Sequence, residues 1–301
     1  AANAARLVGE LADRTAREFP GRRLDLVVLP EHCVMNKPGR AKDKVVTRAF
    51  AEQSLGALAQ RHGCYIAAGI FLMENVAGRD CPRNCCALFD RTGKMVSVYN
   101  KVHTALTWGD VESTDSENGL APGDGFQVVQ TDFGRIGFLV CYDMSYPDGW
   151  AELKRQGADI VAVSSMSPQV FRPSLFAHQH QYWVVTSTPR TQAAVITPLG
   201  MVKGRATDEQ TLLTEIDLSY AICHWSSQLQ GGKALYDKFG AKAVGGIYDP
   251  GEDNGIFWSN SPDMTIGEMI TAVNVRTRDA EAARADRAAK MNRVSGRGEY
   301  R

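Results

Sequence analysis

The sequence predicts an α/β layered sandwich made by a single domain of 301 residues. Helical patterns alternate with pairs of short apolar strands along most of the chain. Several of these strands are apolar on both faces, and such strands need cover on each side. The composition, 44% hydrophobic and 23% charged, fits a globular protein with one large core or two modest ones.

The first hundred residues show two helical patterns and four strands. Apolar residues at helical spacing precede Pro20, and a second helical pattern ends at Gly63, a common helix stop. Two short apolar runs that flank "RTG" predict a hairpin. We expect helices at 1–20 and 45–62, and strands at 24–30, 64–72, 85–90 and 94–100.

The remaining chain continues this alternation. "FQVVQT-DFG-RIGFLVCYD" predicts a second hairpin, and Pro147 and Gly157 bound a short helix. Residues 223–263 are rich in Gly and aromatic residues and show no clean periodicity. Further strands are expected at 158–165, 182–189, 193–198, 201–204 and 211–218, with helices at 176–181 and 278–291.

Charge and cysteine content favour a small-molecule partner in a reducing compartment. The formal net charge is zero and no block of like charge is long, which argues against nucleic acid or a membrane surface as the partner. The seven cysteines are an odd number in a long chain, so free thiols and a cytoplasmic location are expected. The chain opens inside a helical pattern, which leaves a removed upstream segment, such as a signal peptide, open.

Glu31, Lys101 and Cys141 each stand at or just past the carboxyl end of a predicted strand. If these strands are neighbours, the three side chains converge at one edge of the sheet, where open α/β sheets bind ligands. A thiol is mostly protonated at neutral pH and needs a base or nearby positive charge to act as a nucleophile. Glu31 is the candidate base, and Lys101 supplies the positive charge.

The residue after the cysteine supplies a further candidate group. The backbone N–H of Tyr142, together with Lys101, is placed to hold the oxygen of a tetrahedral intermediate. The helix expected to begin near Pro147 adds its dipole. Each residue alone has a plainer interpretation, as a packed thiol, a loop acid or a solvated lysine.

The segments around these residues resemble the nitrilase superfamily of carbon–nitrogen hydrolases. The matching motifs are "LVVLPE", "YNKVH" and "GFLVCYD", in the order that the family keeps. The resemblance implies a four-layer α-β-β-α sandwich, a Glu–Lys–Cys triad, no metal or cofactor, and a homodimer or higher homo-oligomer. The family's first strand has no counterpart before "AANAARL", and residues 223–263 match no family segment; they are expected to line the pocket or to form a subunit contact.

The resemblance also implies a second glutamate in the loop after the lysine. Glu112 occupies the matching place and would orient Lys101 or the substrate, although Glu117 lies in the same polar loop. Trp108, Tyr146 and Phe171 flank the candidate catalytic segments. Core packing is the default role for such aromatic residues, and a wall of the substrate pocket is the functional alternative.

Hydrolysis of a small amide is the expected reaction, through a thioester on Cys141. Tyr142 and Asp143 follow the cysteine where true nitrilases of the family often carry Trp and Glu. Met144, Ser145 and Tyr146 stand where members that act on N-carbamoyl amino acids place Arg or His. These differences favour an uncharged or aromatic amide. Nitrile or N-carbamoyl hydrolysis, acyl transfer to an amine, and a non-catalytic binding or scaffold role remain alternatives.

Overall fold

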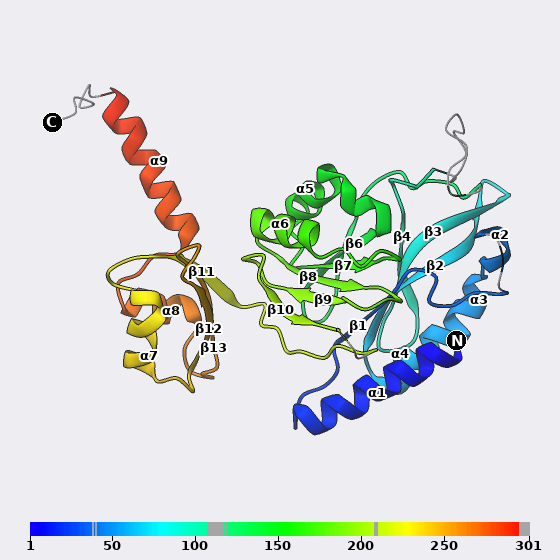
Figure 1. Ribbon diagram of the computed structural model, residues 1–301, viewed down its shortest axis with the longest axis horizontal. Coiled ribbons are helices and arrows are strands. Elements are labelled where there is room, and N and C mark those ends of the chain that lie inside the picture. Colours follow the sequence, from blue (N-terminus) through cyan, green and yellow to red (C-terminus); the bar gives the residue numbers. More distant parts are fainter. Residues whose placement is uncertain (38, 40, 107–116, 118, 208–209, 295–301) are drawn as a thin grey trace. The chain divides into compact units, whose positions relative to one another are not determined.

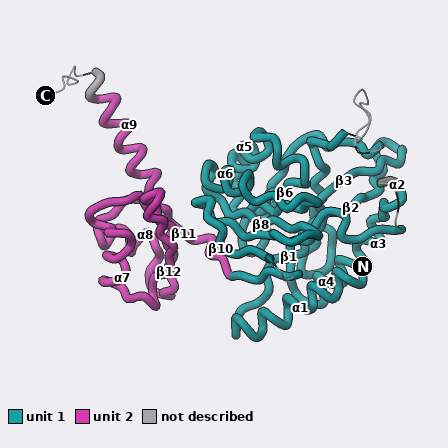
Figure 2. The backbone as a smooth tube through the Cα atoms, viewed as in Figure 1, with its two compact units in different colours: residues 1–214 teal, residues 215–301 magenta. Residues whose placement is uncertain are grey.

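The structure, a computed structural model of the chain, describes residues 1–37, 39, 41–106, 117, 119–207 and 210–294 (Figure 1). The chain divides into two compact units, residues 1–214 and 215–301 (Figure 2). A single domain with 223–263 inside it was expected from the sequence, and this division into domains stays a prediction. Residues 223–263 lie in the second unit, which has a hydrophobic core of its own.

The first unit contains a four-stranded sheet with the order β1-β2-β3-β4. β1 pairs with β2 in parallel, and the β2–β3 and β3–β4 pairs are antiparallel. β1, β2 and β4 therefore run in the same direction, and their carboxyl ends lie at one end of the sheet. The strands are β1 (Leu26–Leu29), β2 (Tyr65–Val76), β3 (Arg79–Phe89) and β4 (Met95–Asn100).

A six-stranded sheet with the order β10-β9-β8-β7-β6-β5 completes the β-structure of this unit. β6, β7 and β8 are parallel neighbours in its centre, and the outer pairs are antiparallel. The strands are β5 (Val128–Gln130), β6 (Arg135–Val140), β7 (Ile160–Ser164), β8 (Trp183–Ser187), β9 (Ala194–Ile196) and β10 (Val202–Arg205).

Three apolar layers show how these elements stack. One layer packs the four-stranded sheet on the six-stranded sheet through Ala67, Cys86, Phe138 and Ala162. A second layer lies between the four-stranded sheet and α1 (Ala2–Glu18), and a third lies between the six-stranded sheet and α5 (Pro147–Arg155) and α6 (Phe171–His180). Figure 1 shows α1 and α4 (Ala57–His62) on the opposite side of the sheets from α5 and α6. The first unit is thus the expected α-β-β-α sandwich.

The remaining helices of this unit follow the local signals of the sequence. α4 ends at His62 and is capped by Gly63, whose φ of +61° is the left-handed conformation that glycine adopts readily. α5 begins with Pro147, because proline lacks only an N–H that the first turn leaves unpaired. The helices are α2 (Ala41–Lys44), α3 (Arg48–Ala51), the π-helical η1 (Glu52–Gly56), α4 (Ala57–His62), α5 (Pro147–Arg155) and α6 (Phe171–His180).

The second unit builds its core on a three-stranded antiparallel sheet with the order β11-β13-β12. α8 begins with a capping box in which Thr265 and Glu268 bond each other's backbone N–H. The elements are β11 (Tyr220–His224), the 3₁₀ turn η3 (Gln230–Gly232), α7 (Lys233–Phe239), β12 (Val244–Asp249), β13 (Asn254–Ser259), α8 (Ile266–Ala272) and α9 (Arg278–Val294).

Two expectations from the sequence were wrong. Residues 211–218 form no strand. At the start of this segment Leu213 packs instead against the hydrophobic cluster that includes Val8 of α1. There the Thr211 hydroxyl donates to Glu10 Oε1 at 2.7 Å and accepts from Arg14 Nη1 at 3.0 Å. The helix expected at 45–62 begins only at Arg48, because the backbone of Val46 pairs with β2.

No helix in the described part of the chain is both long and apolar enough to span a bilayer.

Candidate active site

Glu31 follows β1 after Pro30 and is only 5% exposed. Its Oε1 accepts a hydrogen bond from Asn84 Nδ2 at 2.6 Å, and its Oε2 accepts one from the Met166 N–H at 3.2 Å. Gly69 on β2 makes room for this residue, since a Cβ there would lie 2.6 Å from the Glu31 Cα. The carboxylate is therefore held in a defined position by a rigid sheet end.

Lys101 follows β4 and is 1% exposed, so a charged group is almost completely buried. Its backbone N–H donates to the Asn84 carbonyl at 2.9 Å, which continues the β3–β4 ladder. Its Nζ lies 3.5 Å from Glu31 Oε1 and donates a hydrogen bond to Glu117 Oε1. Two carboxylates thus face one ammonium group, which is the pairing that a buried charge needs.

Cys141 follows β6 and opens a 3₁₀ turn, η2 (Cys141–Ser145). Its φ is +47°, a left-handed conformation that non-glycine residues seldom adopt and that is common at functional sites. Tyr142 is the second residue of this turn. Its N–H therefore belongs to the first turn, whose N–H groups have no partner within the helix.

The Cys141 thiol interacts with the Glu31 carboxylate, the Lys101 charge and Ser165 of the segment after β7. The structure thus brings together the three side chains that the sequence singled out. The sequence analysis expected them at one edge of a single sheet if their strands were neighbours, and this is not the arrangement found. Glu31 and Lys101 come from the four-stranded sheet, and Cys141 comes from the six-stranded sheet that faces it. A hydrogen bond of 2.8 Å from Ser164 Oγ to the Leu29 carbonyl joins the two sheets there.

The protonation states of the site follow from burial and charge. Burial alone would raise the pKa of Glu31, but the Lys101 charge and the hydrogen bond from Asn84 hold that pKa below its ordinary value. Burial would lower the pKa of Lys101, and the charges of Glu31 and Glu117 raise it instead. Burial and the Glu31 charge raise the pKa of the Cys141 thiol, against the opposing effect of Lys101. At neutral pH an ionised carboxylate therefore faces a protonated thiol.

Asp143 joins the lysine segment to the cysteine turn. Its fully buried carboxyl group accepts hydrogen bonds from Tyr99 Oη at 2.9 Å, the His103 N–H at 2.8 Å and the Val140 N–H at 2.9 Å. Burial raises the pKa of Asp143, although these three hydrogen bonds act in the other direction. The bonds fix the backbone next to both Lys101 and Cys141.

The four remaining residues proposed from the sequence have different outcomes. Glu112 and Trp108 lie outside the described residues. The Tyr146 ring stacks on His103 with centroids 3.8 Å apart and meets the Tyr142 ring edge-on, close to the cysteine turn. Phe171 is the first residue of α6 and is 80% exposed, so it is not packed in a core.

Comparison with known proteins identifies the family. The carbon–nitrogen hydrolase family model matches residues 2–222. The chain belongs to the carbon–nitrogen hydrolase family, within the nitrilase superfamily. It is therefore an enzyme of this class. Residues 223–263 begin where the family match ends.

Individual carbon–nitrogen hydrolases resemble the chain to different extents. The omega-amidase NIT2-A of Xenopus laevis is 24% identical over 69% of this chain and 82% of its own length. The deaminated glutathione amidase of Yersinia enterocolitica is 30% identical, but over only 40% of this chain and 42% of its own length.

Solved structures of the superfamily share the fold. Saccharomyces cerevisiae Nit3 aligns with a TM-score of 0.54 at 22% identity, over 67% of this chain and 80% of that chain. An amidase from Nesterenkonia sp. aligns with a TM-score of 0.51 at 16% identity, over 68% of this chain and 80% of that chain.

Two residues at the site of this carbon–nitrogen hydrolase have only a weak signal in the sequence. Glu117 contacts Lys101, and its place in the same polar loop as Glu112 was the only signal for it. Asn84 contacts both Glu31 and Glu117, and it was overlooked because the strand was expected to begin one residue later. Asn84 stands in the "CPRNCC" run, whose Cys85 and Cys86 are both buried on β3.

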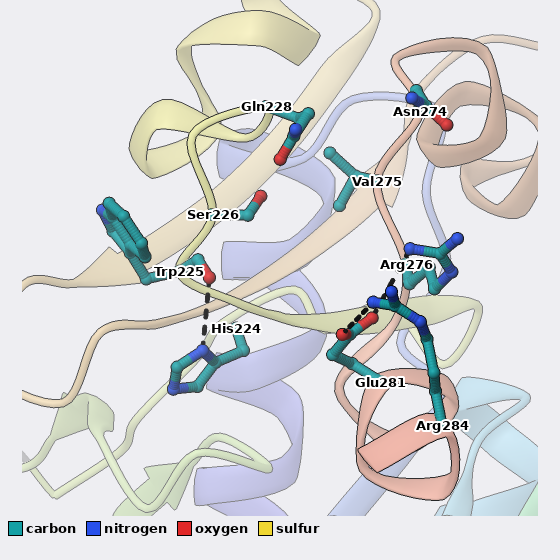
Figure 3. Close-up of a pocket in the computed structure, with 9 residues that line it drawn as sticks. All are labelled: His224, Trp225, Ser226, Gln228, Asn274, Val275, Arg276, Glu281 and Arg284. Carbon is teal, nitrogen blue, oxygen red and sulfur yellow. Dashed lines mark hydrogen bonds and ion pairs between the residues drawn. The ribbon is translucent and has the colours of Figure 1, made fainter. Parts of the chain in front are cut away.

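The hydrolase also has a pocket of about 350 Å³ in its second unit (Figure 3). Both of its arginines already pair with Glu281, Arg276 at 3.6 Å and Arg284 at 2.8 Å. None of its lining residues is a cysteine or a lysine, so it offers neither the nucleophile nor the buried cation found beside Glu31. The pocket is lined by His224, Trp225, Ser226, Gln228, Asn274, Val275, Arg276, Glu281 and Arg284.

Replacing Glu31 should separate the reactivity of the thiol from its catalytic use. In Glu31→Gln the Lys101 charge acts on Cys141 without the opposing carboxylate, so the pKa of the thiol should fall. We expect the pH midpoint of Cys141 alkylation by iodoacetamide to drop by about one unit or more. Peptide mass spectrometry over a pH series measures this midpoint. Glu74→Gln, which removes a carboxylate paired with Arg83 at 3.2 Å, is the control; a midpoint that stays or rises in Glu31→Gln contradicts the charge arrangement.

Proposed function

We propose that the chain hydrolyses the carbon–nitrogen bond of a small amide through a thioester on Cys141. The observation that carries this proposal is the buried Glu31 carboxylate, which lies 3.5 Å from Lys101 Nζ and interacts with the Cys141 thiol. An ionised carboxylate beside a protonated thiol suits the roles of general base and nucleophile. The names of the amidase relatives support an amide as the substrate.

The first half of the reaction forms the thioester. Glu31 accepts the thiol proton while the sulfur attacks the carbonyl carbon of the amide. The oxygen of the tetrahedral intermediate gains negative charge, which Lys101 and the Tyr142 N–H stabilise. Glu31 then gives its proton to the nitrogen, the carbon–nitrogen bond breaks, and ammonia or an amine leaves.

The second half releases the acid. Water attacks the thioester carbon while Glu31 accepts a proton from it, and the carbon–sulfur bond breaks. Glu31 returns the proton to the sulfur, so the thiol and the carboxylate regain their starting states. Burial of Lys101 and Glu31 strengthens their interaction with the developing charge relative to water.

Glu117, Tyr142 and Tyr146 complete the proposed site. Glu117 shares Lys101 with Glu31 and orients its ammonium group, the role that was expected of Glu112. The rings of Tyr142 and Tyr146 lie beside the cysteine turn and suit a flat, uncharged acyl group. This keeps the preference for an uncharged or aromatic amide.

A substrate panel tests the proposal. Aliphatic and aromatic amides, nitriles and N-carbamoyl amino acids are incubated with the enzyme, and ammonia release is measured. We expect amides to have a kcat/KM at least about tenfold above the other classes, equivalent to about 1.4 kcal/mol in transition-state binding. Faster release from nitriles or N-carbamoyl amino acids would contradict the substrate class. Release from no compound would favour a non-catalytic role, and hydroxamate formation with added hydroxylamine would reveal acyl transfer to an amine.

A further inference from the structure

Asn84 is an uncharged residue that contacts two of the charged groups of the site. It lies on β3, is 1% exposed, and pairs in register with Phe71 of β2. Its Nδ2 donates to Glu31 Oε1 at 2.6 Å and to Glu117 Oε2 at 2.9 Å. One amide group therefore bridges the two carboxylates that face Lys101.

The orientation of this side chain follows from the strand. Alternate residues of β3 face opposite sides of the sheet, and Cys86 packs in the layer between the two sheets. Asn84 is two residues away and shares that face, which directs its side chain toward the six-stranded sheet. Its carbonyl accepts from the Lys101 N–H, so its backbone also fixes the start of the lysine segment.

The chemistry of the partners determines which end of the amide points at them. Ionised carboxylates only accept hydrogen bonds, and the NH₂ group supplies two donors. A flipped amide would place Oδ1 against two carboxylate groups. In the arrangement found, Oδ1 is buried and has no hydrogen-bond partner among the described residues. A buried acceptor without a partner is unusual in a native protein. Here it follows from the orientation of the amide, because the NH₂ group must face the two carboxylates to donate to both of them.

We propose that Asn84 is a positioning residue, whose side-chain amide holds the Glu31 and Glu117 carboxylates on Lys101 and keeps Glu31 ready to accept a proton from Cys141. This proposal rests on the proposed function, in which Glu31 is the base. Two carboxylates that share one ammonium group repel each other, and the amide supplies the neutral donor that offsets part of this repulsion. The hydrogen bond from Asn84 is also one of the causes that lower the pKa of Glu31.

Two variants of similar size test the role of the donor. Asn84→Ala removes both hydrogen bonds, and Asn84→Ser leaves nearly the same space but retains one hydroxyl donor. We expect the pH midpoint of Glu31 to rise by about one to two units in Asn84→Ala and by less in Asn84→Ser. NMR of the protein labelled with ¹³C at the side-chain carboxyl carbon of glutamate gives this midpoint directly. The Glu31 signal is assigned by its loss in Glu31→Gln.

The pH midpoint at which kcat/KM falls on the acid side should follow the NMR midpoint of Glu31. We expect both midpoints to move to higher pH together, with most of the lost kcat/KM recovered at alkaline pH. Asn254→Ala is the matched control, because Asn254 is a buried asparagine, 8% exposed, that donates to the Glu252 carbonyl rather than to a carboxylate. Its Oδ1 is likewise without a partner among the described residues, so the two asparagines differ mainly in what they donate to. The control should leave both readouts unchanged.

The two readouts separate this proposal from the proposed function. If the wild type turned over no amide, the proposed function would fail, and NMR would still measure the effect of Asn84 on Glu31. A Glu31 midpoint that does not rise in the Asn84 variants would overturn the positioning role even in an active enzyme. A kcat/KM that falls equally at every pH would show that Asn84 is only structural. If Asn84→Ala does not fold, the comparison of Asn84→Ser with the wild type decides.

Discussion

Replacing Cys141 with alanine should abolish amide hydrolysis. Without the sulfur no thioester forms, and loss of a catalytic nucleophile typically lowers kcat by roughly 10⁴-fold or more. The thiol is a small, half-buried side chain at a backbone position whose φ is +47°, which alanine fits as well as cysteine does. We therefore expect the free energy of unfolding to change by only about 1 kcal/mol. Initial rates of ammonia release and urea denaturation measure the two effects.

Cys81→Ala is the matched control, because Cys81 is also a partly exposed free thiol and lies on β3 three residues before Asn84, on the opposite face of the strand. It should retain the activity of the wild type. Mass spectrometry of the enzyme mixed rapidly with a slow amide should show an added acyl group, which Cys141→Ala should not acquire. Amide hydrolysis by Cys141→Ala at the rate of the wild type would exclude the thioester mechanism.

Replacing Lys101 with methionine should destabilise the fold and also stop turnover. The variant leaves the buried Glu31 side chain and the partly buried Glu117 side chain without their cation. Breaking a buried ion pair on one side typically costs about 3–5 kcal/mol of unfolding free energy. The proposed oxyanion contact is lost as well, which typically lowers kcat by about 10²-fold to 10³-fold.

The loss of stability in Lys101→Met should depend on pH in a defined direction. In the wild type the pKa of Glu31 is lower in the folded state than in the unfolded state. This difference stabilises the fold at every pH above the unfolded-state pKa, and the stabilisation is lost as the pH falls through the folded-state pKa. In the variant, burial raises the pKa of Glu31, so protonation at acid pH stabilises the fold. The difference between the two proteins should therefore shrink as the pH falls from about 7 toward about 5.

Urea denaturation at several pH values measures this difference. Lys94→Met changes an exposed lysine in the turn before β4 and should shift stability by no more than about 0.5 kcal/mol. A Lys101→Met protein as stable as this control at neutral pH would contradict the buried pairing.

The sequence singled out three residues of the candidate site because they stand at strand ends. The apolar runs before Glu31, Lys101 and Cys141 are strong strand signals, and each residue comes at or just past the end of one. The sequence did not reveal which of these strands belongs to which of the two sheets, because the pairing of strands depends on contacts between distant segments. The same limit explains residues 211–218, which have a strand-like composition but form no strand.

The positions of Glu117 and Asn84 show a second limit. Glu117 reaches Lys101 through a loop conformation with a φ of +44° and a hydrogen bond from its N–H to the Ala105 carbonyl at 2.9 Å. A polar loop has no periodicity that would distinguish Glu117 from Glu112. Asn84 contacts the site only because β3 extends back to Arg79, beyond the apolar residues that predicted the strand.

Cys141 and Glu31, its proposed proton acceptor, follow strands of different sheets, so in the proposed mechanism the packing between the sheets sets the distance over which the proton moves. Small side chains such as Ala67 and Ala162 allow the sheets to approach closely there. A larger side chain in that layer would push the two sheets apart and lengthen the proton's path without touching any reacting atom. If the proposed mechanism holds, the side-chain volumes of that buried layer matter for the reaction rate as well as for folding.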